Sequence, residues 1–214
     1  MRDFATLFDL DGVVFDTESN YTRFWAEKGE KYFPKIKNFS QIIKGRSLSN
    51  ILESYFDDYK SDWAEIEKDL YEMEEGMTFP YIAGVENLLK QIHEADIPIC
   101  LVTSSDAVKM QTVLKSRPEI EEYFPLRVIG SDIKNAKPAP DCYLLGAKKC
   151  NMPANRCIVL EDSLAGIQAG RSAGMKVVGL STTVGVEELE GRVDKIIPDF
   201  SSFSLDDILE ILEK

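Results

Sequence analysis

The chain has 214 residues, of which 44% are hydrophobic, enough for one well-formed core plus an accessory domain. Its formal net charge of −12 disfavours nucleic acid as a partner, because proteins that bind a phosphate backbone need a basic face. No apolar stretch reaches the ~18 residues that cross a membrane, and the first residues do not have the pattern of a signal peptide. We therefore expect a cytoplasmic protein that binds neither nucleic acid nor membranes, and a monomer in the absence of any signal for assembly.

The amino-terminal part of the chain predicts one strand followed by a long helical insert. The strand covers residues 5–8, and the next comparable strand signal appears only at residues 97–102. The segment between them is rich in aromatic and charged residues and favours helices over residues 20–32, 48–59 and 61–76. Pro80 and Gly84 then mark a return to the main domain. We expect residues 17–79 to form a separate helical cap.

Helices and strands alternate from residue 85 onward. Apolar residues recur at i, i+3, i+4 and i+7 from Val85, which is the spacing of an amphipathic helix. Further strands are predicted over residues 126–129, 157–160, 176–180 and 194–197, and further helices over residues 106–115, 140–150, 163–173 and 205–212. Repeated βα units predict an α/β fold, a Rossmann-like parallel sheet sandwiched by helices. Its domain would consist of residues 1–16 and 80–214, with the all-helical cap inserted between them.

Two carboxylates stand directly after the first predicted strand. Asp9 and Asp11 are two residues apart, so an extended chain places both on one face, at the carboxyl end where open parallel sheets bind ligands. A calcium loop that begins at Asp9 would need other residues where Val13, Val14 and Asn20 stand. Like charges beside buried surface are costly without a cation. The pattern suits a nucleophile, a proton donor and a divalent cation.

Three later strand ends add groups that suit an anionic substrate. Thr103 and Ser104 follow the strand at 97–102 and precede a helix, where free amides and hydroxyls bind anions; a helix cap by a serine is the plainer interpretation. Lys137 lies on a loop stiffened by prolines and can neutralise a phosphate. Glu161 and Asp162 follow the strand at 157–160 and can complete the shell of a hard cation.

Other chemistries lack the residues that they need. His93 is the single histidine and occupies a helical position, so a serine or cysteine nucleophile has no obvious base. No glycine-rich mononucleotide loop of the GxxxxGK type is present. The cysteines have no paired metal spacing, and we expect buried thiols in a reducing compartment. They are Cys100, Cys142, Cys150 and Cys157.

Four strings in this order resemble the haloacid dehalogenase superfamily of phosphotransferases, and the resemblance covers nearly the whole chain. They are DLDGVVFDTE at residues 9–18, VTSS at 102–105, KPAPD at 137–141 and LEDSLAGIQAG at 160–170. The resemblance implies that Asp9 forms an aspartyl-phosphate and that Asp11 is the general acid and base. The dehalogenase members lack an aspartate at the second position, so Asp11 favours phosphoryl transfer.

The resemblance also implies the remaining site. Mg²⁺ would be held by the side chain of Asp9, the backbone carbonyl of Asp11 and the acids Glu161 and Asp162, chiefly Asp162. The transferring phosphoryl group would be bound by Thr103, the Ser104 amide and Lys137, and Lys137 would also act on Asp9. A small phosphorylated metabolite, in the first place a sugar phosphate, is the expected substrate.

The predicted insert resembles the small helical cap of the β-phosphoglucomutase-like subfamily. The string IKGRS at residues 43–47 resembles the cap loop that enters the active site, so Lys44, Gly45 and Arg46 are expected to contact the substrate. In the mutase a histidine and an arginine stand where this chain has Tyr21 and Leu48. Hydrolysis is therefore the favoured activity. A β-phosphoglucomutase and a non-catalytic member that binds phosphate or Mg²⁺ remain as alternatives.

Overall fold

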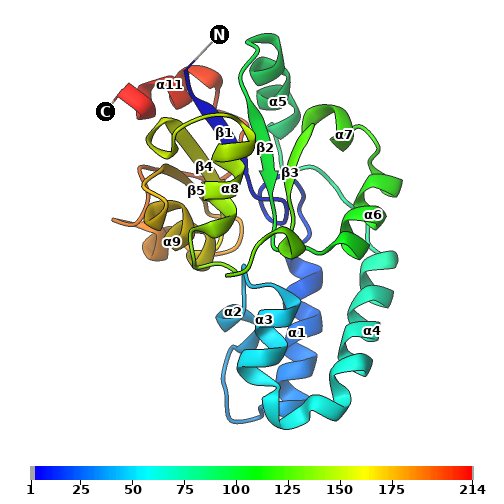
Figure 1. Ribbon diagram of the computed structural model, residues 1–214. Helices are drawn as coiled ribbons and strands as arrows, with labels where there is room; N and C mark the ends of the chain where they lie inside the picture. Colours follow the sequence, from blue (N-terminus) through cyan, green and yellow to red (C-terminus); the bar gives the residue numbers. More distant parts are fainter. Residues whose placement is uncertain (1–2, 214) are drawn as a thin grey trace.

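The computed structural model describes residues 3–213; residues 1, 2 and 214, which the predicted core range includes, lie outside the described residues. Within this range, six parallel strands form one sheet in the order β3-β2-β1-β4-β5-β6 (Figure 1). The strands are β1 (Ala5–Phe8), β2 (Ile99–Val102), β3 (Leu126–Val128), β4 (Cys157–Glu161), β5 (Lys176–Leu180) and β6 (Lys195–Ile197). The predicted α/β class is confirmed.

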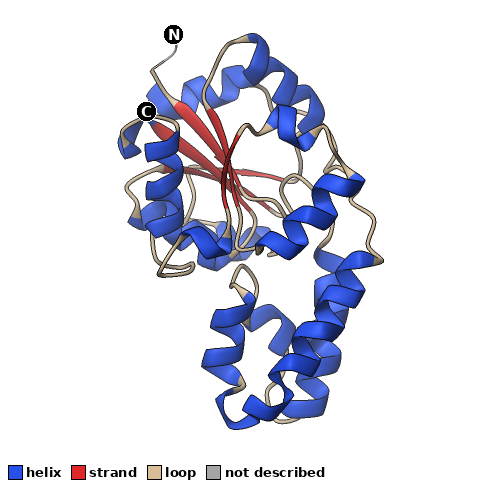
Figure 2. Ribbon diagram, turned by 45° about the vertical axis from the view of Figure 1, so that its right-hand side comes forward, coloured by secondary structure: helices blue, strands red, loops and turns tan. Residues whose placement is uncertain are grey.

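Helices cover both faces of this sheet (Figure 2). Successive residues of β1 point to opposite faces, so Phe8 packs into one apolar cluster and Leu7 into the other. Phe8 shares its cluster with residues of α5 (Val85–Glu94), α6 (Ala107–Ser116), α7 (Ile120–Tyr123) and α11 (Leu205–Glu213). Leu7 shares its cluster with residues of α8 (Asp141–Lys149), α9 (Leu164–Ser172) and α10 (Val186–Leu189). The two clusters hold β1 rigidly in the centre of the core.

The helical insert lies beyond the carboxyl ends of the strands (Figure 1). It contains α1 (Glu18–Tyr32), α2 (Phe39–Ile42), α3 (Leu48–Tyr55) and α4 (Trp63–Glu75). These helices bury an aromatic cluster of their own, which includes Trp25, Tyr32 and Phe56. The predicted cap is therefore present, and its interior is separate from the two clusters of the sheet.

The two segments that join the insert to the sheet run side by side. The amide of Asp16 donates to the carbonyl of Pro80 at 2.9 Å. Phe15 packs against the rings of Phe79 and Tyr81, with centroids 5.6 and 5.0 Å apart. The chain thus leaves and re-enters the core at one place, below the end of β1.

Several element boundaries differ from the predicted ones. The helix predicted over 48–59 ends at Tyr55, because Phe56 leaves the helical conformation with φ −104° and ψ 21°, and the 3-10 segment Asp57–Asp62 follows. The strand predicted over 97–102 begins only at Ile99, after Pro98, which has no N–H to donate. The short helices α2, α7 and α10 have too few residues to show a helical period. The described residues include no helix with the length and apolar character of a membrane span.

Candidate active site

Asp9 lies at the carboxyl end of β1, where its amide continues the ladder by donating to Leu160 at 3.1 Å. The residue is 7% exposed and lines a cavity between the sheet and the cap. Lys137 donates from Nζ to Oδ1 of Asp9 at 2.5 Å, while Oδ2 receives no donor from the described residues. One carboxylate oxygen is thus fixed by the core, and the other is free to act on a ligand.

Lys137 is almost completely buried, with 1% of its surface exposed. Its Nζ also donates to Oε1 of Glu161 at 2.6 Å, and the hydroxyl of Tyr143 donates to the same oxygen at 3.0 Å. Burial alone would lower the pKa of Lys137, but the carboxylates of Asp9 and Glu161 hold it well above its usual value. Lys137 therefore stays charged beside Asp9 and sits behind it, outside the cavity lining.

Glu161 has both of its oxygens occupied by protein donors. Oε2 accepts from the amides of Asp162 and Ser163, both at 2.9 Å, and from the Ser163 hydroxyl at 3.0 Å. A Cβ on Gly166 would come within 1.6 Å of Oε1, so this glycine leaves room for the carboxylate. Glu161 does not line the cavity. The structure places it as the partner of Lys137, in contrast to the metal-ligand position expected from the sequence.

Asp162 lines the cavity next to Asp9. Its Oδ2 accepts a hydrogen bond from the Thr183 hydroxyl and lies against the backbone of Gly12, where a Cβ would come within 1.8 Å. Gly12 also has φ +74°, which favours glycine. Burial raises the pKa of Asp162 well above its usual value, and the charge of Glu18 is the next largest cause.

The carboxylates of Asp9 and Asp162 fit a divalent cation. Burial raises the pKa of Asp9 to about 7, with Lys137 opposing this and Glu161 adding to it. No three histidine, cysteine or acidic side chains among residues 3–213 form a ready-made metal cluster. Mg²⁺ does not need one, because it uses one or two carboxylates and completes its shell with water and phosphate oxygens. Two buried carboxylates that both line the cavity match that requirement.

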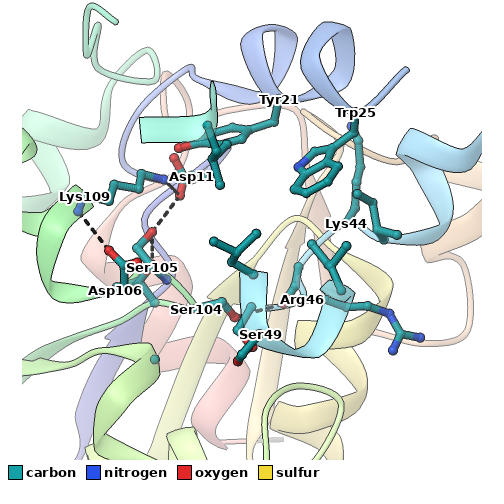
Figure 3. A pocket seen from close by; sticks show the side chains of 18 of the residues that line it. Asp11, Tyr21, Trp25, Lys44, Arg46, Ser49, Ser104, Ser105, Asp106 and Lys109 are labelled. Atoms are coloured by element: carbon teal, nitrogen blue, oxygen red, sulfur yellow. Dashed lines mark hydrogen bonds and ion pairs between the residues drawn. The ribbon is translucent and has the colours of Figure 1, made fainter. Parts of the chain in front are cut away.

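Asp11 lines the cavity together with Asp9 and is held by three donors. Thr17 donates from its hydroxyl to Oδ1 at 2.6 Å. Ser105 donates to Oδ2 at 3.3 Å, and Lys109 forms an ion pair with Oδ2 (Figure 3). Lys109 comes from α6, is buried, and also lies 4.4 Å from the ring centroid of Tyr21. Lys109 was missed by the sequence analysis, in which it was one charge among others on a predicted helix.

The loop after β2 turns its polar groups toward Asp11 and the cap. Thr103 donates from its hydroxyl to Ser105 at 3.0 Å and accepts from the Ser105 amide at 3.0 Å. The helix cap of α6 is Asp106, which accepts from the Lys109 amide at 3.0 Å. The plainer interpretation of a serine cap is therefore wrong, because neither Ser104 nor Ser105 caps the helix.

The cap loop reaches the core, but its three expected substrate contacts differ in position. The carbonyl of Gly45 accepts from the Ser104 hydroxyl at 2.9 Å. Lys44 lies in the cavity with Nζ 3.2 Å from Glu18, whereas Arg46 donates to Asn50 at 3.0 Å and turns away from the cavity centre (Figure 3). Lys44 and Gly45 are thus brought to the site more directly than Arg46.

The cavity has a volume of about 440 Å³ and is lined by both domains. Asp9, Asp11, Thr103, Ser104 and Asp162 line the core side. Tyr21, Trp25, Leu48 and Ile51 are among the residues on the cap side. His93 does not line it and instead bonds the carbonyl of Tyr123 at 2.9 Å, as expected for a structural histidine. Asp9, Asp11, Thr103, Ser104 and Asp162 therefore converge on one cavity, whereas Lys137 and Glu161 lie behind its lining.

Curated relatives of similar length carry phosphatase names. The chain is 28% identical over 208 residues to the probable pseudouridine-5'-phosphatase of Drosophila melanogaster, covering 92% of this chain and 90% of that protein. It is 28% identical over 207 residues to hexitol phosphatase A of Escherichia coli (strain K12), covering 92% and 91%. The chain spans only 20% of the length of one further relative, the Arabidopsis thaliana protein SUPPRESSOR OF QUENCHING 1, chloroplastic.

Among solved structures, the β-phosphoglucomutase from Clostridium difficile superposes with a TM-score of 0.80 at 28% identity, covering 100% of this chain and 98% of that chain. These likenesses support the expected class of enzyme, a phosphatase of the haloacid dehalogenase type, and the expected subfamily. The family model for haloacid dehalogenase-like hydrolases matches residues 6–180, which include all the motif residues placed above. The chain belongs to the haloacid dehalogenase-like hydrolase family.

Proposed function

We propose that this protein hydrolyses small phosphomonoesters, specifically sugar phosphates, through an aspartyl-phosphate on Asp9. The observation that carries the proposal is the state of the Asp9 carboxylate. Lys137 fixes Oδ1 at 2.5 Å from behind, and Oδ2 meets the cavity without a protein donor. A carboxylate held in this way is preorganised for in-line attack on phosphorus, and phosphoryl transfer depends mainly on such positioning and on charge neutralisation.

The reaction then proceeds in two displacements. Asp11 takes up a proton as the substrate binds. Oδ2 of Asp9 forms a bond to phosphorus as the bond from phosphorus to the ester oxygen breaks, and Asp11 gives that proton to the leaving oxygen. Asp11, now a carboxylate, takes a proton from water as that water attacks the phosphorus of the intermediate. The bond between Asp9 and phosphorus breaks, inorganic phosphate leaves, and both aspartates return to their initial states.

The remaining core groups bind and neutralise the phosphoryl group. Thr103 and the Ser104 amide hold its oxygens, and Lys137 balances the charge on Asp9 while Glu161 orients Lys137. Family membership is consistent with a divalent metal cofactor. We assign Mg²⁺, held by the Asp9 and Asp162 side chains and the Asp11 carbonyl; when bound, it offsets the repulsion between Asp9 and a phosphate dianion.

We further propose that residues 17–79 move as a cap on the core formed by residues 1–16 and 80–214. Two observations support this division. The two segments that join the cap to the core lie side by side at Asp16 and Pro80, and the cap has an aromatic interior of its own. The bond between Ser104 and Gly45 would close the cap over the substrate. The substrate would then contact Lys44, Gly45 and Arg46. Arg46 would contact it through the backbone of the loop and not through its guanidinium.

A β-phosphoglucomutase is the second candidate, and the likeness to the Clostridium difficile enzyme supports it. A mutase must bind a second phosphate, yet Leu48 and Tyr21 offer no charge for one. A non-catalytic member is the third candidate, which the complete set of Asp9, Asp11 and Lys137 disfavours.

The central experiment is Mg²⁺-dependent release of phosphate from p-nitrophenyl phosphate. We expect turnover by the wild type that is abolished in Asp9→Asn. Turnover that survives in Asp9→Asn would contradict covalent catalysis by Asp9. Glucose 1-phosphate with a bisphosphate primer separates the two enzymatic candidates, because a mutase would yield glucose 6-phosphate with little free phosphate.

We also propose a monomer in the cytoplasm whose partners are small phosphorylated metabolites, not nucleic acid or membranes. The net charge of −12 supports the exclusion of nucleic acid, and the four buried free cysteines support a reducing compartment. Light scattering at micromolar concentration tests the monomer: a mass near 24.1 kDa is expected, and twice that mass would overturn it.

A further inference from the structure

The cap half of the cavity carries an apolar and aromatic surface in addition to its polar residues. Trp25 projects its ring into the space, and Tyr21 lies beside it (Figure 3). The cap side chains that make up this surface are Tyr21, Trp25, Leu48, Ile51, Leu52, Trp63 and Leu70. Such a surface packs against the carbon face of a ligand and adds no charge of its own.

Every cation that lines the cavity, among the described residues, already has a partner. Lys44 lies 3.2 Å from Glu18, and Lys109 forms an ion pair with Asp11. Arg46 donates to Asn50 and places its guanidinium 5.9 Å from the ring centroid of Tyr55. Lys44 and Lys109 are therefore neutralised by carboxylates, and Arg46, which has no carboxylate partner, turns its guanidinium away from the cavity centre (Figure 3). No cation on the cap side, among the described residues, is thus placed to bind a second anionic group of a substrate.

Among residues 3–213, Glu74, near the end of α4, is the buried carboxylate of the cap in which one oxygen has a hydrogen-bond donor and the other has none. It lines the cavity with only 4% of its surface exposed. Tyr21 donates from its hydroxyl to Oε1 at 2.8 Å, whereas Oε2 is buried with no hydrogen-bond partner in the described chain. A buried carboxylate oxygen without a donor is costly, so a ligand that supplies a donor would be stabilised there.

We infer that the cap half of the cavity recognises an uncharged, hydroxylated leaving group, one hydroxyl of which donates to Oε2 of Glu74, and that it rejects leaving groups with a second negative charge. The inference rests on the proposed function and specifies its substrate class. An anionic leaving group would meet Glu74 and no free cation. A site built to accept a hydroxyl discriminates strongly, because an unsuitable ligand leaves the buried group unpaired.

Pairs of substrates that differ in one charged group test this inference on the wild type. Glycerol phosphate is compared with 3-phosphoglycerate, and fructose 1-phosphate with fructose 1,6-bisphosphate. We expect kcat/KM to be at least about tenfold higher for the first member of each pair, which corresponds to one buried charged hydrogen bond. Equal values within each pair, or a preference for the anionic member, would overturn the inference.

Two substitutions test whether Glu74 is the residue that discriminates between uncharged and anionic leaving groups. Glu74→Gln removes the charge at constant shape and should narrow the ratio between glycerol phosphate and 3-phosphoglycerate by about tenfold. Glu74→Met also removes the acceptor and should lower the preference for glycerol phosphate over p-nitrophenyl phosphate. Glu72→Gln, on the exposed face of the same helix, is the matched control and should leave both ratios unchanged. Unchanged ratios in folded Glu74→Gln would contradict the assignment.

A binding measurement separates this inference from the proposed function. Calorimetry on Asp9→Asn with Mg²⁺ should give tighter binding for glycerol phosphate than for 3-phosphoglycerate, whether or not the wild type turns either over. Hydrolysis of p-nitrophenyl phosphate without this selectivity would sink the inference and leave the proposed function standing. Selective binding by Asp9→Asn together with no hydrolysis by the wild type would contradict the proposed function and support the inference. The assays are run at pH 8, because burial raises the pKa of Glu74 to about 7.

Discussion

The two halves of the cavity satisfy their polar groups in different ways. On the core side, Lys137 and Glu161 have partners at every charged atom. On the cap side, Nε of Arg46 and Oε2 of Glu74 are buried without a hydrogen-bond partner among residues 3–213. The polar groups of the core half thus have their hydrogen bonds and ion pairs before a substrate binds, as catalysis requires. In the cap half, we infer that the substrate supplies the missing hydrogen bonds.

The largest effect expected on the core side beyond the nucleophile is the loss of the proton donor. Asp11→Asn keeps the shape of Asp11 but cannot transfer a proton, so kcat for glycerol phosphate should fall by ~10²–10⁴. The fall should be smaller for p-nitrophenyl phosphate, whose leaving group needs little protonation. Steady-state kinetics on both substrates measure it, and equal losses on both would argue against general-acid catalysis by Asp11.

Metal binding at the core side should depend on pH. Burial raises the pKa of Asp9 from 3.8 to about 7. The folded state thus binds this proton more tightly than the unfolded chain, so the stability that Asp9 contributes is full below about pH 4 and is lost as the pH rises through about 7. Mg²⁺ replaces the proton, and its apparent affinity should be about 30-fold weaker at pH 5.5 than at high pH.

Thermal unfolding with and without Mg²⁺ measures this linkage. The increase in melting temperature on adding Mg²⁺ should be larger at pH 8 than at pH 5.5. Asp9→Asn is the control, because an asparagine has no proton to lose at this position, so the increase in its melting temperature should depend less on pH. An increase that does not depend on pH in the wild type would show that Asp9 is not a metal ligand.

Lys109 joins the two halves, because it contacts both Asp11 and the ring of Tyr21. Lys109→Met should lower kcat/KM for glycerol phosphate by about tenfold, and less for p-nitrophenyl phosphate, because Asp11 loses the partner that positions it. Lys109→Arg should recover part of the loss. Lys115→Met changes an exposed lysine on the same helix and is the control. An equal loss on both substrates would indicate a general structural defect.

The smallest expected effect concerns the closed cap. Gly45 has φ +76°, and a Cβ there would lie 2.3 Å from Oγ of Ser163. Gly45→Ala should therefore loosen the cap and raise KM several-fold with little change in kcat. Gly174→Ala has the same backbone strain at φ +74° but no atom within 4 Å of the new Cβ, so it should lower stability without changing KM. Equal KM values in the two variants would contradict the proposed closure.

The core half was largely predictable from the sequence for a simple physical reason. The carboxyl ends of parallel strands meet at one edge of a sheet, so Asp9, Thr103 and Asp162 had to come together once the strands were identified. The position of Glu161 could have been found too, because adjacent residues at a strand end point to opposite sides. Glu161 and Asp162 could not both face the cavity.

The cap half was not predictable in the same way. Glu74 and Lys109 meet the cavity because α4 and α6 pack at a particular angle and rotation, and neither is encoded in a local pattern. Glu74 continues the i, i+4 row of the buried residues Ile66 and Leu70, a spacing that distinguishes it from the exposed Glu72 and that the sequence prediction did not use. Short helices such as α2 were missed because they are stabilised by packing, with too few residues for a periodic signal.

The most direct test of the account is a crystal structure of the wild type soaked with Mg²⁺ and beryllium fluoride, which mimics a phosphoryl group on a carboxylate. We expect the beryllium bonded to Oδ2 of Asp9, with Mg²⁺ between Asp9 and Asp162. An adduct on another residue, or a metal ion bound away from these two aspartates, would contradict the claim that Asp9 receives the phosphoryl group.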